Sequence, residues 1–137
     1  MPAHITVLFP FVPVDELDDQ VSEELRELFA REPSFDFELP RVERFPEVVW
    51  LAPEPPEPFN RLTQLVFERF PDYPPYEGVH ETVIPHLTVA EGDAAVQEAV
   101  EAALTPHLPI RGRAERITLL VEDERCVWHA TGRFALA

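Results

Sequence analysis

Lysine is absent from this sequence of 137 residues, in which all eleven basic residues are arginine, and cysteine occurs once, as Cys126. A single cysteine excludes an internal disulfide framework and is typical of a protein of the reducing cytoplasm. No run of 18 apolar residues occurs, which excludes a membrane-spanning helix. The N-terminus also lacks the basic region of a signal peptide. We therefore expect a cytoplasmic protein, and the exclusive use of arginine points to a GC-rich bacterial genome.

Positive charge is scarce as well, because 26 acidic residues outnumber 11 basic ones and give a net charge of −15. Proteins that bind long nucleic acids draw affinity from basic surfaces, so the composition argues against such a partner. Five of the arginines nevertheless lie within residues 111–137: Arg111, Arg113, Arg116, Arg125 and Arg133. This cluster suits a short anionic ligand, or it is an ordinary solvated strand surface; the composition leaves both interpretations open.

Hydrophobic residues make up 45% of the chain, as in ordinary globular proteins, so residues 1–137 are expected to form a single domain. Amphipathic helices are predicted after a cap at Asp15, over residues 59–70 and after a cap at Asp93. Between residues 71 and 85 we expect a loop. Strands are predicted from β-branched or alternating apolar runs, at residues 4–9, 35–39, 47–51, 86–90, 116–121 and 126–134.

The order strand, helix, strand, strand occurs twice, at residues 4–52 and 86–134, and defines repeat halves of about 1–70 and 80–137. Trp50 and Trp128 close the two repeats and lie 78 residues apart. Duplicated sequences usually fold as two similar lobes related by a pseudo-twofold axis. We therefore predict a bilobal α+β fold. Two antiparallel sheets, one per half, are expected to flank a central cleft, with helices on their outer faces.

Each repeat opens with the same short motif, first as His4-Ile5-Thr6 and then, 82 residues later, as His86-Leu87-Thr88. In a strand, residues i and i+2 point to the same face, so the histidine and threonine of each motif project together. A pseudo-twofold axis would bring two imidazoles and two hydroxyls into one space. A neutral histidine can accept a proton and a protonated one can donate it. The threonine hydroxyls can donate hydrogen bonds to phosphoryl oxygens.

With these motifs and this repeat layout, the sequence resembles the 2H phosphoesterase superfamily, in particular the bacterial 2′-5′ RNA ligase-like proteins. The resemblance implies a bilobal α+β fold with His4, Thr6, His86 and Thr88 as catalytic residues in the central groove. It implies metal-independent hydrolysis of 2′,3′-cyclic phosphates or 2′-5′ phosphodiesters of short nucleotides or RNA ends, without a cofactor. In some members the reaction includes reversible 2′-5′ ligation. We expect a monomer with no long nucleic acid partner.

Two other functions are compatible with parts of the sequence. A non-catalytic nucleotide- or phosphate-binding module would keep the pocket, although phosphate binding alone is better served by arginine or backbone amides than by two histidines. A metal-dependent hydrolase is disfavoured, since the histidines form no pair or cysteine cluster of the kind that binds zinc. The three histidines outside the motifs are interpreted as a loop residue (His80), a helix-end residue (His107) and a strand residue (His129). Phe45 and Tyr76 are candidates for stacking on a base.

Overall fold

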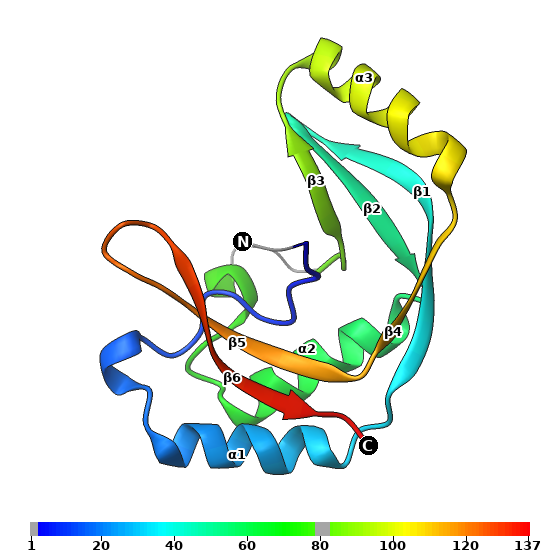
Figure 1. Cartoon of the computed structure of the whole chain (residues 1–137). Helices are drawn as coiled ribbons and strands as arrows, with labels where there is room; N and C mark the ends of the chain where they lie inside the picture. Colours follow the sequence, from blue (N-terminus) through cyan, green and yellow to red (C-terminus); the bar gives the residue numbers. More distant parts are fainter. Residues whose placement is uncertain (1–2, 79–82) are drawn as a thin grey trace.

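A computed structural model describes residues 3–78 and 83–137 (Figure 1). The helices and strands follow in the order α1 (Asp19–Ala30), β1 (Phe35–Phe45), β2 (Val48–Glu54), α2 (Glu57–Arg69), β3 (Leu87–Glu91), α3 (Ala94–Leu104), β4 (Ile110–Ala114), β5 (Arg116–Glu122) and β6 (Trp128–Ala135). Short 3₁₀ segments lie at η1 (Val14–Glu16), η2 (Pro75–Gly78) and η3 (Thr105–His107). Within the two described ranges, no helix is long and apolar enough to cross a membrane.

The strands form two antiparallel sheets. One has the order β3-β2-β1-β4, and the other is the β5–β6 hairpin. Only Glu115 separates β4 from β5, so the chain passes directly from the first sheet into the second. The larger sheet curls over one side of the molecule, the hairpin lies on the other, and the N-terminal segment runs between them (Figure 1). The fold is therefore α+β with curled antiparallel sheets.

The two sheets do not correspond to the two sequence halves, which corrects the prediction of one sheet per half. The β1–β2 hairpin of the first half is extended by β3 of the second half, and α3 packs against β3 and β2. Conversely, α1 of the first half packs against β6 of the second. Each hairpin is thus covered by the helix of the other half, so the halves are interlocked.

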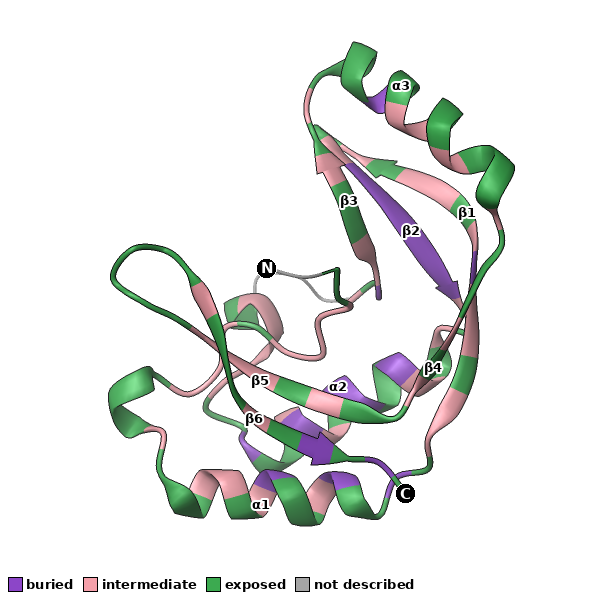
Figure 2. Ribbon diagram, viewed as in Figure 1, coloured by how far each residue is buried: buried purple, intermediate pink, exposed green. Residues whose placement is uncertain are grey.

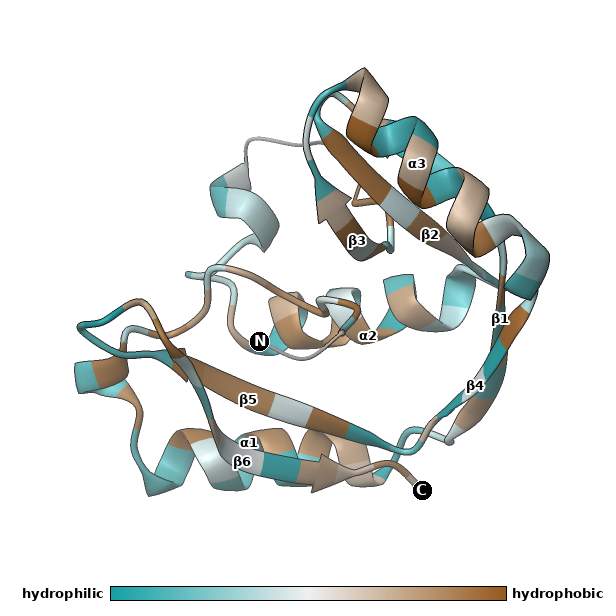
Figure 3. Cartoon of the chain, turned by 45° about the horizontal axis from the view of Figure 1, so that its top comes forward, coloured by the Kyte–Doolittle hydropathy of each residue, from teal (hydrophilic) through white to brown (hydrophobic). Residues whose placement is uncertain are grey.

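The buried residues concentrate in two places (Figure 2). Strand β2 is buried over residues 49–53, and Val49 is fully inaccessible. A second core lies where α1 and α2 meet β6; Phe29 and Phe134 are its most buried members, at 1% and 2% exposed. Strands β2 and β5 are the most continuously hydrophobic segments (Figure 3). A run of apolar residues without alternation is typical of a strand covered on both faces, as β2 is.

Two helices begin at aspartate caps, whose carboxylates accept hydrogen bonds from backbone N–H groups of the first turn. Asp93 accepts from the backbone of Val96 at 3.0 Å, which confirms the predicted start of α3. Asp18, and not Asp15, accepts from the backbone of Val21 at 2.9 Å. The prediction for α1 was therefore wrong by about one turn, because Asp15 belongs to the separate segment η1.

Strand β1 extends well beyond the predicted residues 35–39 and passes through Pro40. Its register with β2 shifts between Glu38 and Arg41, so Pro40 lies in a bulge. A bulge leaves a residue unpaired, and the missing N–H of proline therefore costs no ladder hydrogen bond there. As a result, Phe45 lies in the sheet at the end of β1. The predicted strands at 47–51, 86–90, 116–121 and 126–134 are confirmed as β2, β3, β5 and β6 with shifted ends.

Residues 4–9 do not form the predicted strand. Their only sheet-type pairing among the described residues is an isolated antiparallel bridge between Ile5 and Leu87. The carbonyl oxygen of Val7 instead accepts a 2.6 Å hydrogen bond from the Thr63 hydroxyl of α2. A backbone N–H in η2 donates to the carbonyl oxygen of Phe9, also at 2.6 Å. These contacts satisfy backbone acceptors that a ladder would otherwise use.

Candidate active site

The two His-x-Thr motifs meet at the bridge between Ile5 and Leu87. In an antiparallel pair this register sets the histidine of each motif opposite the threonine of the other. In a regular strand pair with this register, the four side chains would project from one side and the bridging residues from the other. The opposed pairs are His4 with Thr88 and Thr6 with His86. Diagonal neighbours, such as the two histidines, lie about 7–8 Å apart in this geometry, which leaves room for a phosphate group.

The imidazole of His86 is oriented by its surroundings. Its Nδ1 lies 2.7 Å from the carbonyl oxygen of Ile84. A carbonyl can only accept, so Nδ1 carries the proton of the neutral ring and Nε2 is left to exchange a proton with a ligand. The rings of Phe45 and Trp50 contact the imidazole edge-on, with centroids 5.5 and 5.9 Å away. Ring packing and the hydrogen bond together restrict both the tautomer and the tilt.

The Trp50 side chain packs beneath the second motif. It lies opposite Thr88 in the β2–β3 register, so the two side chains share a face of the sheet. Phe45 stacks on the indole with centroids 4.6 Å apart and an interplanar angle of 22°. Trp50 is only 7% exposed, and its buried N–H has no acceptor within residues 3–78 and 83–137. Trp50 is thus closed to solvent, while Phe45 is half-buried.

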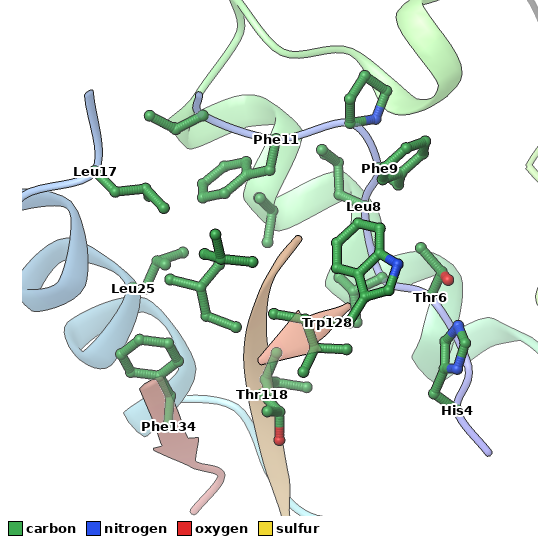
Figure 4. A pocket seen from close by; sticks show the side chains of 18 of the residues that line it. His4, Thr6, Leu8, Phe9, Phe11, Leu17, Leu25, Thr118, Trp128 and Phe134 are labelled. Carbon is green, nitrogen blue, oxygen red and sulfur yellow. The ribbon is translucent and has the colours of Figure 1, made fainter. Parts of the chain in front are cut away.

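The first motif lies at the edge of a cavity of about 740 Å³ between the N-terminal segment and β5. His4 and Thr6 line one end, and Leu25 and Phe134 of the core lie at the other (Figure 4). Among the described residues, neither histidine nor threonine of the second motif contributes to this lining. The cavity is mostly apolar because valine, leucine, isoleucine and phenylalanine side chains make up most of its lining.

Among the residues that line this cavity, Phe9, Thr118 and Trp128 were not identified as functional from the sequence, and Arg116 was identified only as a member of the arginine cluster. Phe9 is 48% exposed and contacts Trp128 edge-to-face. One signal could have drawn attention to Trp128, namely its position at the close of the second repeat, matching Trp50. The other three depend on the approach of β5 to the N-terminal segment, which no local pattern encodes.

The C-terminal arginine cluster is divided by the fold. Arg111 pairs with Glu38 at 3.1 Å and Arg113 with Asp36 at 2.9 Å across the β1–β4 ladder, so these two belong to an ordinary strand surface. Arg116 makes no ion pair with a described residue, and it lines the cavity beside the first motif. It is therefore the member of the cluster best located to meet an anionic ligand.

The two aromatic residues predicted to stack on a base have different settings. One face of the Phe45 ring is covered by Trp50. Tyr76 lies in η2 with φ at 51°, and burial of its phenol raises its pKa. Both base-binding assignments stay predictions. His80 lies outside the described residues.

The other histidines lie apart from the motifs in sequence. His129 Nε2 is 2.6 Å from the carboxylate of Asp123, and this contact lowers the pKa of Asp123. His107 ends η3 and is exposed. In the part of the chain that the structure describes, no three histidine, cysteine, aspartate or glutamate side chains lie close enough together to hold a metal ion.

Comparison with known proteins identifies relatives of this fold. The family model described as the 2′-5′ RNA ligase superfamily matches residues 1–125. Escherichia coli LigT, crystallised with 3′-AMP, is 19% identical with a TM-score of 0.64, over 98% of this chain and 76% of LigT. TT0787 of Thermus thermophilus is 22% identical with a TM-score of 0.65, over 98% and 78% of the two chains. A crystallised phosphoesterase is 22% identical with a TM-score of 0.63, over 98% and 76%. No curated protein matches the sequence.

Proposed function

We propose that this chain, which belongs to the 2′-5′ RNA ligase superfamily, is a metal-independent phosphodiesterase that acts on 2′,3′-cyclic phosphates or 2′-5′ linkages of short nucleotides or RNA ends. The observation that supports the proposal is the antiparallel bridge between Ile5 and Leu87, the central residues of the two His-x-Thr motifs. The proposed site lies where the N-terminal segment meets the start of β3, at the bridge between the two motifs. In this site His4, Thr6, His86 and Thr88 are the catalytic residues.

The proposed reaction uses one imidazole as a general base and the other as a general acid. One neutral histidine accepts a proton from water, whose oxygen attacks phosphorus. The other, protonated, donates to the ribose oxygen as its bond to phosphorus breaks, so the cyclic phosphate opens to a monoester. The hydrogen bond from Nδ1 of His86 to the Ile84 carbonyl supports Nε2 as the atom that exchanges this proton. The threonine hydroxyls donate hydrogen bonds to the non-bridging oxygens, where negative charge must be stabilised.

The charge distribution favours a short substrate. A net charge of −15 repels a long polyanion outside the pocket, whereas Arg116 offers a local positive charge beside the first motif. LigT has been crystallised with 3′-AMP, ATP and NADP+, all of nucleotide size. By analogy, we propose nucleotide-sized ligands for this chain.

Hydrolysis of nucleoside 2′,3′-cyclic phosphates by the purified protein in the presence of excess EDTA tests the proposal. We expect turnover to a single 2′- or 3′-monophosphate isomer, whose identity shows which ribose oxygen departs. Turnover that disappears with EDTA and returns with one divalent ion would contradict the metal-free mechanism. Tight binding of the nucleotide with no turnover would instead support a non-catalytic binding module.

A further inference from the structure

The two tryptophans, each near the end of its repeat, have different surroundings. Trp50 lies beside the second motif, opposite Thr88 in the β2–β3 register. Trp128 begins β6 and lines the same cavity as Thr6 of the first motif. The ring contacts of Trp50 can therefore be compared with those of Trp128.

The indole of Trp50 is already packed against other rings. The Phe45 ring stacks on it nearly in parallel, at 4.6 Å and 22°, and His86 contacts it edge-on. Such an offset-stacked arrangement is the one that aromatic rings prefer over a face-to-face sandwich. At 7% exposure, Trp50 leaves no room for a ligand.

The surroundings of Trp128 lack this parallel partner. Among the described residues, its aromatic neighbour is Phe9, at 6.2 Å and 65°, which is an edge-to-face contact. Phe9 is itself 48% exposed, and Trp128 is only partly buried. In Figure 4 the indole lies beside Thr6 and Phe9 at the end of the cavity that holds His4. Among the described residues, no aromatic ring is therefore stacked on the Trp128 indole beside the first motif, whereas Phe45 is stacked on that of Trp50.

We propose that Trp128 is the stacking platform for the planar base of the substrate, with Phe9 flanking it edge-on. This inference rests on the proposed function and identifies its base subsite. A nucleobase matches the site, because it presents a planar π-face to the indole while its phosphate lies towards His4 and Thr6. Stacking of this kind accepts any base, so the subsite predicts selectivity for nucleotides over base-free phosphates and little preference among bases.

Kinetics on a matched pair of substrates test the subsite. We expect Trp128→Leu to lower kcat/KM for adenosine 2′,3′-cyclic phosphate about 5- to 150-fold, the range equivalent to one stacked base, mainly through KM. The same variant should cleave base-free ribose 2′,3′-cyclic phosphate as the wild type does. Trp128→Phe should retain most of the activity on the nucleotide. Val127→Ala, which removes apolar surface from the adjacent exposed residue, is the matched control. It should leave kcat/KM unchanged for both substrates.

Fluorescence gives a second readout that needs no turnover. In a Trp50→Phe background, Trp128 is the sole tryptophan, and its emission should be quenched by 2′-AMP but not by inorganic phosphate. Equal loss of activity on both substrates in Trp128→Leu, or no quenching by 2′-AMP, would overturn the assignment. A wild-type protein that cleaves neither substrate would refute the proposed phosphodiesterase, while the quenching titration would still decide whether Trp128 binds a base.

Discussion

The buried hydroxyl of Thr63 on α2 donates a 2.6 Å hydrogen bond to the carbonyl oxygen of Val7, the residue that follows the first His-x-Thr motif. Because residues 4–9 lack a strand ladder, this contact helps to fix the path of the motif. Thr63 is thus a positioning residue that acts through the backbone of Val7 and does not touch the proposed substrate.

Replacement of Thr63 by valine should therefore lower activity as well as stability. The Val7 carbonyl would lose its donor, at a cost of about 1–3 kcal/mol in unfolding free energy. We expect kcat for a cyclic phosphate to fall while KM changes little, because His4 would be less well held. Thr63→Ser retains the hydroxyl and should restore kcat. If Thr63→Val lowers the melting temperature but leaves kcat unchanged, Thr63 has only a structural role.

Phe45 allows its two possible roles to be separated. If its ring orients His86 through the Phe45–Trp50 layer, Phe45→Leu should reduce kcat and leave KM for the nucleotide nearly unchanged. If it stacks on the base, as the sequence suggested, KM should rise instead. We expect the first result, since one face of the ring is already covered by Trp50. Steady-state kinetics on adenosine 2′,3′-cyclic phosphate distinguish the two outcomes.

Most helices and strands could be predicted from the sequence because their types depend on local patterns. Apolar spacing after Asp93 suffices for α3, and a short apolar run suffices for β3. Pairing partners depend on distant residues, so the exchange of helices between the halves was missed. Strand β4 was missed for the same reason: Arg111 and Arg113 look like loop residues until Glu38 and Asp36 lie opposite them.

The position of residues 4–9 was also beyond local prediction. Their β-branched residues favour a strand, yet the Thr63 hydroxyl and a backbone N–H in η2 take the acceptors of Val7 and Phe9. Local propensity was thus overridden by tertiary hydrogen bonds. The bridge between Ile5 and Leu87 nevertheless brings the backbones of the two motifs into contact.

The turn between β5 and β6 should be sensitive to acid. Contact with His129 lowers the pKa of the Asp123 carboxyl from its ordinary value of 3.8, and backbone N–H groups of Arg125 and Val127 reinforce the shift. A lowered folded-state pKa stabilises the fold above the ordinary pKa, and this stabilisation is lost as the pH falls through the lowered value. Asp123→Asn should therefore lower the melting temperature at neutral pH, and the difference should shrink as the pH falls below 3.8. A difference that does not change with pH would contradict this origin.

Substrate length offers a test of the acidic surface. Mono- and dinucleotides ending in a cyclic phosphate should compete as well as a longer RNA with the same end, because the net charge of −15 opposes contacts beyond the pocket. Inhibition constants at several salt concentrations would measure this. Affinity that rises steadily with RNA length and falls steeply with salt would indicate an extended basic path, and the argument from charge would be wrong.

The central claim is that His4 and His86 act together as one acid and one base, and a double-mutant comparison of kcat/KM tests it most directly. Each single alanine replacement should reduce kcat/KM about 10²–10⁴-fold. The double replacement should cost far less than the product of the two, because residues that act as a unit are not additive. The wild-type profile against pH should be bell-shaped, since one imidazole must be neutral while the other is charged. A His4→Ala variant with full activity beside an inactive His86→Ala variant would contradict the account, because only one motif would then be catalytic.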